Sequence, residues 1–474
     1  MRLSAPTGLT IAVAGATGFI GRRLCARLRD AGHQVIGIGR SVRPDTTQDG
    51  VLWRQADLFS LLQCEQALEG VDQLVYLVHS MSPSARLTQA SFEDMDLILA
   101  DNMSRAARKM GVDRIVYLGG LVPEDDHLSR HLSSRREVED VLAGHGVPVT
   151  TLRAGLVIGP QGSSFAILER LVRRLPVLAL PKWTRQVCQP IALDDLLDII
   201  LRVIDTDAAR GRSIDVGGPT ILTYRDLLVE TARAMGVRRR FIDLPVGSPV
   251  LSEVWVTAVT GQPRSLTGPL IESLDHSMVA RDHAVQKDLG VVGDDVPTAL
   301  RRALAGETRS PTVAVPRAPH RPPRPDVRSV QRMRLPPGRD AMWAAETYLR
   351  WLPEFLAPIV RVDTTEMASR ICTRGLPITL LELTPSEARS SSDRALLYVT
   401  DGTLARVRDP VRGRLEMRTV GDGSVLLAAI HDFEPQLPWP VYRATQARSH
   451  LFVMNGFRRH LAREALADRA SAPQ

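Results

Sequence analysis

The feature that most constrains this chain is a glycine-rich turn near the N-terminus, between an apolar stretch and a helical pattern. Gly15, Gly18 and Gly21 follow the apolar residues 9–14. Gly15 permits a tight turn, Gly18 lets backbone approach a ligand, and Gly21 lets the helix pack closely on its strand. The helix N-terminus adds N–H groups and a positive dipole end. The pattern predicts a site for a dinucleotide pyrophosphate, although such turns also use glycine for purely structural reasons.

The composition indicates a multi-domain globular protein. A chain of 474 residues with 44% hydrophobic content is long enough for two or three folded units. The formal net charge is +7, but the basic residues are spread among 53 acidic ones. Nucleic-acid binding would favour a basic stripe with interleaved aromatic residues. We therefore expect a small-molecule substrate and no nucleic-acid partner.

The cysteines and the apolar runs bear on redox state and location. Cys25, Cys64, Cys188 and Cys372 form no CxxC pair and have no metal-ligand spacing with histidine. They are expected to be reduced core residues, with no metal site. The N-terminus lacks the pattern of a signal peptide, and no apolar run approaches the roughly 18 residues of a membrane span. The sequence predicts a cytoplasmic protein without a transmembrane segment.

The first part of the chain alternates apolar strands with helical patterns. After the glycine turn, one helix is expected at 91–110. Further strands are expected at 35–38, 51–53, 73–78, 114–118 and 149–153. Nearly continuous apolar strands are typical of a parallel sheet covered on both faces. The fold class is therefore α/β, a Rossmann-like doubly wound sheet with its ligand beyond the carboxyl ends of the strands.

The rest of the chain divides by composition. The pattern is less regular over 155–305, which suggests a small substrate lobe and a first domain of 1–305. Six prolines among arginines at 306–330 predict an extended linker that packs in no core. Globular composition resumes at 331–474.

This C-terminal part is expected to be an α+β domain, a small antiparallel sheet wrapped on a long helix. Helical patterns occupy 340–352 and about 443–467. Strands are expected at 379–383, 395–400, 415–419 and 425–433.

Several further motifs follow the glycine turn in a fixed order. They are Asp57-Leu58 and the segments 153–160, 189–195 and 215–219. Together with the turn, they resemble the atypical short-chain dehydrogenase/reductase superfamily over residues 1 to about 305. The similarity is greatest to the group of NmrA-like proteins and the 39 kDa accessory subunit of respiratory complex I. Segments 429–433 and 437–442 resemble the DUF2867 domain, which implies architecture but no chemistry.

The resemblance assigns cofactor contacts. It implies that Asp57 and Leu58 contact adenine, although an Asp that opens a helix is also an ordinary N-cap. His79 would lie near the nicotinamide. The residues expected around the pyrophosphate are Gly15, Thr17, Gly18, Phe19, Ile20 and Gly21.

Arg40 follows the second strand, where cofactors are discriminated. Arginine there suits a 2′-phosphate, whereas an acidic residue would bind a ribose hydroxyl. NADP(H) is therefore favoured over NAD(H), although Arg40 could instead be one of many solvated arginines. Arg22 and Arg23 are weaker candidates for the same phosphate.

The catalytic residues depart from the family pattern. Redox members carry a Tyr and a Lys four residues apart on the helix after the fifth strand, and His131 and Arg135 occupy those positions here. The spacing places both on one helix face. Histidine can exchange a proton near neutral pH, but an adjacent guanidinium disfavours its protonated form unless Glu139 offsets that charge. His79 could serve chemistry or hold its loop by hydrogen bonds.

Two main functions follow from these residues. The first is an atypical NAD(P)H-dependent oxidoreductase acting on a small carbonyl or quinone-like substrate. The alternative is a non-catalytic NADP(H)-binding redox sensor or assembly factor, which the missing Tyr favours. A third possibility is an apolar ligand between the sheet and long helix of the C-terminal domain. The substrate and the oligomeric state stay open.

Overall fold

The structure is a computed structural model, and it divides into two compact units. It describes residues 8–79, 87–123, 128–244, 271–319 and 326–471, together with 256, 257, 259, 261 and 268. The first unit comprises Met1–Met81 and Leu99–Pro319, and the second comprises Ser82–Ile98 and His320–Gln474. No helix in the described part of the chain has the length and apolar character needed to cross a membrane.

The first unit is built on an eight-stranded sheet. Seven strands are parallel, and one edge strand is antiparallel. Their spatial order is β13 (Ser213–Val216), β8 (Val149–Ala154), β7 (Arg114–Gly120), β5 (Gln73–Tyr76), β1 (Thr10–Ala14), β2 (Gln34–Gly39), β4 (Val51–Gln55) and β3 (Thr46–Gln48). The short antiparallel β3 was not among the predicted strands.

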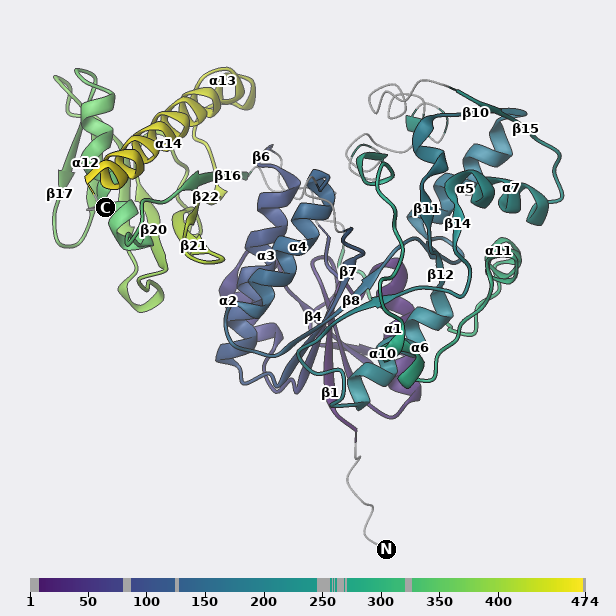
Figure 1. Ribbon diagram of the computed structural model, residues 1–474. Helices are drawn as coiled ribbons and strands as arrows, with labels where there is room; N and C mark the ends of the chain where they lie inside the picture. The colour runs from purple at the N-terminus through teal and green to yellow at the C-terminus, as the bar shows by residue number, and fades with distance from the viewer. Residues whose placement is uncertain are drawn as a thin grey trace, which may run out of the picture. The chain divides into compact units, whose positions relative to one another are not determined.

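Helices cover both faces of this sheet (Figure 1). One face carries α1 (Phe19–Asp30), α6 (Leu193–Asp205) and α10 (Ala284–Asp288); the other carries α2 (Leu61–Ala67), α3 (Phe92–Lys109) and α4 (Arg130–Ala143). The division into units cuts α3 between Ile98 and Leu99. The Rossmann-like doubly wound fold predicted from the sequence is confirmed.

A smaller lobe lies beyond the carboxyl ends of the parallel strands (Figure 1). Its own apolar core includes Phe165, Trp183 and Leu227. Its elements are β9 (Val157–Ile158), α5 (Ser163–Arg174), β10 (Val177–Leu180), η1 (Lys182–Arg185), β11 (Val187–Cys188), β12 (Ile191–Ala192), β14 (Leu222–Thr223), α7 (Tyr224–Ala234), β15 (Arg240–Asp243) and α11 (Val296–Ala305). The lobe therefore stands where a parallel sheet binds its ligand.

The proline-rich segment after α11 packs against the first unit through core and backbone contacts. Its residue Val313 is 1% exposed and belongs to the core of the first unit. The Arg43 N–H donates to the Pro316 carbonyl at 2.6 Å, and the Ala318 N–H donates to the Ser41 carbonyl at 3.0 Å. Residues up to 319 thus pack along the first unit, whereas composition predicts a linker without core contacts. The prediction rested on the proline and arginine content of the segment and overlooked Val313, the apolar residue that enters the core. Residues 320–325 lie outside the described part.

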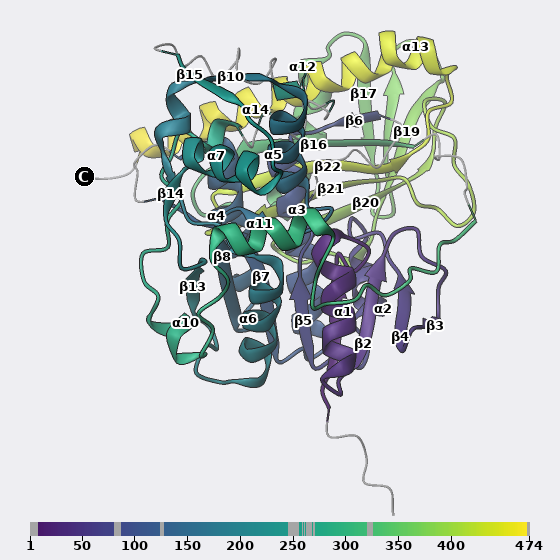
Figure 2. The same ribbon diagram turned by 90° about the vertical axis from the view of Figure 1, so that its right-hand side faces the viewer.

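The second unit is an antiparallel sheet with helices on one face (Figure 2). The predicted α+β class of the C-terminal part is confirmed. The strand order is β17 (Val360–Thr364), β18 (Ser369–Thr373), β19 (Thr379–Pro385), β20 (Arg394–Asp401), β21 (Arg414–Val420), β22 (Val425–Phe433), β16 (Val327–Arg334) and β6 (Leu87–Gln89). The helices are α12 (Ala341–Phe355), α13 (Trp439–Ala444) and α14 (Gln446–Ser471), with the short η2 (Glu387–Arg389) before β20.

Aromatic side chains pack between this sheet and its helices. The ring centroids of Tyr348 and Phe457 are 5.2 Å apart, and those of Trp351 and Phe457 are 5.3 Å apart. All three side chains belong to the core of the unit. The place where an apolar ligand was considered is thus occupied by the protein's own aromatic residues.

The sequence did not indicate that residues 82–98 belong with the C-terminal part. Strand β6 pairs in parallel with β16 through Leu87 and Val327. The Gln89 side-chain amide also donates to the Ala447 carbonyl of α14 at 3.2 Å. A three-residue strand that pairs with a partner 240 residues later leaves no local signal.

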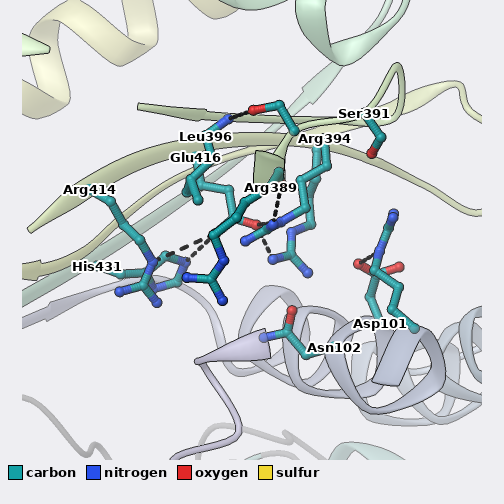
Figure 3. Close-up of polar contacts among 12 residues, drawn as sticks. Asp101, Asn102, Arg389, Ser391, Arg394, Leu396, Arg414, Glu416 and His431 are labelled. Carbon is teal, nitrogen blue, oxygen red and sulfur yellow. Dashed lines mark hydrogen bonds and ion pairs between the residues drawn. The ribbon is translucent and has the colours of Figure 1, made fainter. Parts of the chain in front are cut away.

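A charged cluster lies on the sheet face opposite the aromatic core (Figure 3). Arg414, Glu416 and Arg418 alternate along β21, so their side chains share one face. The Arg394 Nε donates to Glu416 Oε1 at 2.7 Å, and Arg418 donates to the same oxygen. Burial alone would raise the pKa of Glu416, but Arg418 and Arg394 hold it well below its usual value of 4.5. This carboxylate is therefore charged and bonded.

Replacing Glu416 should destabilise the second unit strongly. Glu416→Gln leaves two arginines without their counter-charge, and loss of one partner of a buried pair costs about 3 kcal/mol or more. Urea unfolding at pH 7 measures the loss. The matched control is Glu382→Gln, whose partner Arg370 is 60% exposed, so its cost should stay below about 1 kcal/mol.

The contribution of Glu416 to the stability of the second unit should decrease as the pH falls. Because the pKa of Glu416 is lower in the folded chain, its contribution is complete above pH 4.5 and is lost as the pH falls further. Equal destabilisation by both substitutions at pH 7 would contradict this role of Glu416.

Candidate cofactor and substrate site

The glycine turn has the geometry that the spacing predicts. Gly15 adopts a φ of +88°, a conformation that favours glycine. The Gly18 N–H donates to the Gly15 carbonyl oxygen at 3.0 Å and closes the turn. A Cβ on Gly21 would lie 2.3 Å from that oxygen, so helix α1 can pack here only without a side chain. Backbone occupies the space that a side chain would take, which is the requirement of a phosphate-binding turn.

The first turn of α1 can receive an anion. Its N-cap residue Gly18 makes no side-chain capping bond, and the turn contains no acidic residue. The backbone N–H groups and the dipole therefore favour a negative charge at this end. The Phe19 ring lies against Gly159 and Gly162, where an added Cβ would be 3.0 and 3.1 Å from ring atoms. Phe19 thus anchors the turn to the start of the lobe.

The other predicted members of the turn have different positions. Thr17 is exposed, and Ile20 packs against the core of the first unit. A Cβ on Gly39, the last residue of β2, would lie 2.8 Å from the Thr17 methyl group. The end of β2 is therefore adjacent to the glycine turn.

Arg40 follows directly and is exposed. Within the described residues its guanidinium has no hydrogen-bond or ion-pair partner, while its carbonyl accepts from the Gln55 amide at 2.8 Å. The two weaker candidates are engaged in the fold. The Arg22 Nε donates to the Val313 carbonyl at 3.0 Å, and Arg23 donates to the Phe19 carbonyl at 3.1 Å. Arg40 is the one of the three that keeps its charge available for a ligand.

Asp57 and Leu58 follow β4, at the same edge of the sheet. The Asp57 carboxylate accepts from the Phe59 N–H at 3.2 Å, and Ser60, not Asp57, is the N-cap of α2. The Leu58 carbonyl accepts from the Asn102 side chain at 2.8 Å. These bonds fix a turn beside the end of β2, which suits an adenine contact, and they exclude the simple capping role for Asp57.

His79, His131 and Arg135 form a cluster past the ends of β5 and β7. An Arg135 amino group donates to His79 Nδ1 at 2.5 Å. The rings of His79 and His131 stack with centroids 5.8 Å apart and an interplanar angle of 5°. Because arginine can only donate, His79 Nδ1 must be unprotonated, which assigns the ring proton to Nε2. The predicted pair on α4 is thus joined by the predicted strand-end histidine.

Both histidines are neutral at physiological pH. Burial and then Arg135 lower the pKa of His131 to about 3. The residue His79 as a whole is exposed, but desolvation of its ring, followed by the charges of Arg135 and His131, lowers its pKa well below 6.5. Glu139 does not offset Arg135, because it binds Arg153 through hydrogen bonds of 2.9 and 3.0 Å. The cluster therefore presents one fixed positive charge and two uncharged rings.

An apolar pocket of about 170 Å³ opens beside this cluster. Its strand-end wall includes Gly120, His131 and Ala154, and its lobe wall includes Trp183 and Tyr224. No Asp, Glu, Lys or Arg is among the described residues that line it. The lobe wall has no signal in the sequence, because Trp183 and Tyr224 are distant positions that only folding brings together.

The sheet order arranges these features in a row. The strands run β8, β7, β5, β1, β2 and β4. From β4 to β8, the carboxyl ends carry Asp57, Arg40, the glycine turn, His79 and the apolar pocket. An extended dinucleotide binds along such an edge, with its phosphates at the glycine turn.

The comparisons with known proteins agree with this arrangement. Residues 11–217 match the NAD dependent epimerase/dehydratase family. An uncharacterised protein of Mycobacterium tuberculosis is 27% identical over 246 residues, which cover 52% of this chain and 25% of that protein. The chain thus spans about a quarter of the length of this relative.

A (4-alkanoyl-5-oxo-2,5-dihydrofuran-3-yl)methyl phosphate reductase of Streptomyces griseus is 27% identical over 244 residues, 50% of this chain and 77% of that protein. A solved NADPH-dependent quinone oxidoreductase of Escherichia coli superimposes with a TM-score of 0.50 at 21% identity and covers 62% of this chain and 99% of that one. This structure supports the fold alone. The finer resemblances, to NmrA-like proteins, the complex I subunit and DUF2867, stay predictions. Residues 11–217 of the chain thus match the NAD dependent epimerase/dehydratase family model, and the solved structure agrees with the fold of the first unit.

Proposed function

We propose that this protein is an NADP(H)-dependent oxidoreductase that reduces an apolar carbonyl or quinone-like compound. The observation that carries the proposal is the fixed Arg135 charge next to two neutral histidines, of which His131 lines an apolar pocket at the strand ends. The relative from Streptomyces griseus is a reductase, which supports the same class of reaction.

The cofactor would be held by the glycine turn and Arg40. Gly15, Gly18 and Gly21 leave room for phosphate, and the Arg40 guanidinium suits a 2′-phosphate. Bound NADPH would supply the hydride. We assign the adenine contact to Asp57 and Leu58, and the nicotinamide side to His79.

Arg135 would act on the substrate oxygen. When a carbonyl accepts a hydride, negative charge develops on its oxygen, and a preorganised cation in a site with little water stabilises that charge. His131, with a pKa of about 3, is a poor proton donor at neutral pH. We therefore give His131 the role of a neutral hydrogen-bonding group at the pocket wall, while a water molecule delivers the proton. A quinone suits this arrangement, because its reduced anion needs no concerted protonation.

The apolar lining of the pocket also bears on the class of substrate that it can bind. A nucleotide-sugar carries a diphosphate and many hydroxyl groups, which need charged and polar partners when buried. The lining is dominated by leucine, isoleucine and aromatic side chains. An uncharged apolar substrate matches it better.

Removing the Arg40 charge should change cofactor preference. Arg40→Ala should weaken NADPH binding about tenfold and leave NADH binding within twofold, because only NADPH has the 2′-phosphate. Calorimetric titration of both cofactors measures this. Arg43→Ala is the control, since this exposed arginine lies three residues further along the loop. Equal effects of Arg40→Ala on both cofactors would remove Arg40 from the specificity site.

Replacing Arg135 should slow the reaction without abolishing cofactor binding. Arg135→Gln should lower kcat for NADPH-dependent quinone reduction roughly 100-fold, the usual effect of losing one oxyanion-stabilising group. Arg136→Gln changes the exposed neighbour on α4 and should leave kcat unchanged. Steady-state kinetics with 1,4-naphthoquinone provide the comparison. A kcat of Arg135→Gln within twofold of the wild type would contradict this role.

A further inference from the structure

The lobe wall of the apolar pocket carries a polar atom that the fold leaves without a partner. Tyr224, the first residue of α7, is 5% exposed and lines the pocket. Its ring makes an edge contact with Trp183, with centroids 6.1 Å apart. Its backbone N–H donates to the Gln186 carbonyl at 3.1 Å, but its hydroxyl has no partner within the described residues.

Tyr224 is buried as a residue, but its hydroxyl keeps some accessible surface. Most tyrosines in a protein interior find an acceptor for the hydroxyl group. Pocket-lining polar groups are a recognised exception, because a ligand satisfies them. The environment keeps this hydroxyl protonated, since burial, followed by the nearby Cys188, raises the pKa of Tyr224. Tyr224 is therefore equipped to donate a hydrogen bond and not to exchange a proton.

Each of the two walls of the pocket carries a side chain that can form a hydrogen bond with a ligand. His131 lies on the strand-end wall beside Arg135, and Tyr224 lies on the lobe wall. Most of the lining between them is apolar, and one of the two serine hydroxyls, that of Ser273, already has Ser129 as a neighbour at 3.2 Å. A ligand that satisfies both walls needs an acceptor at each end of an apolar body.

We propose that Tyr224 is a specificity-determining residue that donates a hydrogen bond to a second oxygen of the substrate, other than the oxygen that lies at the strand-end wall beside His131. The inference rests on the proposed function, because it assigns a substrate class to the same site. That class is an apolar molecule with two carbonyl-type oxygens at opposite ends, such as a para-quinone. A site that hydrogen-bonds a ligand group discriminates strongly against an analogue that lacks it.

The test is calorimetric binding without cofactor, so it does not depend on hydride transfer. The probes are 1,4-naphthoquinone and naphthalene, which share a bicyclic skeleton but differ in the two oxygens. Tyr224→Phe should weaken binding of the quinone about fivefold, corresponding to one hydrogen bond of about 1 kcal/mol. Binding of naphthalene should stay within twofold.

A matched variant separates ligand binding from stability. Tyr348→Phe removes another buried hydroxyl, in the core of the second unit, that has no partner among the described residues. It should leave the affinity for both probes unchanged. Thermal unfolding of both variants checks that each still folds.

The outcomes distinguish this inference from the proposed function. An unchanged quinone affinity in Tyr224→Phe, an equal weakening for both probes, or no binding of either probe to the wild type would overturn the inference. The proposed function is tested separately by NADPH oxidation in the presence of the quinone. Quinone binding that depends on Tyr224 without NADPH oxidation would support the inference and refute the proposed function.

Discussion

The close packing of helix α1 on its strand at Gly21 is the constraint on which the site depends. Only a residue without a side chain can bring this helix against the Gly15 carbonyl, because a Cβ would lie 2.3 Å from the oxygen. The same contact points the uncapped helix N-terminus at the carboxyl edge of the sheet. It also sets the neighbouring positions, since Gly39 lies against Thr17 and the Phe19 ring lies against Gly159. The glycine turn, the end of β2 that precedes Arg40 and the lobe are thus tied to one packing contact.

The second organising interaction is electrostatic. Arg135 occupies the position to which the sequence resemblance assigns a lysine, and it donates a hydrogen bond to His79. The hydrogen bond from Arg135 to His79 and the stacking of His79 on His131 hold three groups in a fixed arrangement. Each histidine is discouraged from protonation by burial and by the same guanidinium. This arrangement favours stabilisation of negative charge over proton donation, which agrees with a substrate whose reduction does not need a concerted proton.

Much of the first unit could be predicted because its signals are local. The turn at Gly15–Gly21 and the apolar strands each occupy a short stretch of sequence, and together they predict the parallel sheet. The helix expected at 91–110 is α3, Phe92–Lys109. The C-terminal unit was also accessible, since strand Val425–Phe433 and the long final helix carry clear periodicity. The capping Asp340, whose carboxylate accepts from the Trp343 N–H at 2.8 Å, marks the start of α12.

What could not be predicted depends on contacts between distant residues. Strand β6 is defined by its pairing with β16, and Val313 is defined by the core it enters. The candidate site shows the same limit. The positions of His131 and Arg135 followed from their spacing on one helix, but the bond from Arg135 to His79 required the fold. The lobe wall at Trp183 and Tyr224 had no motif to mark it, because apolar lining residues share only their position in space.

The most direct test is calorimetric titration of NADPH into the 474-residue chain and its Gly21→Ala variant. Gly21 lies in helix α1 without a positive φ, so alanine acts through the contacts of its Cβ with the Gly15 and Ala16 backbone. The matched control is Gly413→Ala, whose added Cβ would meet its nearest atom at 3.5 Å. The account predicts NADPH binding by the wild type and control, and at least tenfold weaker binding by Gly21→Ala with its fold retained. No binding of NADPH to the wild type, or equal affinity in all three proteins, would contradict it.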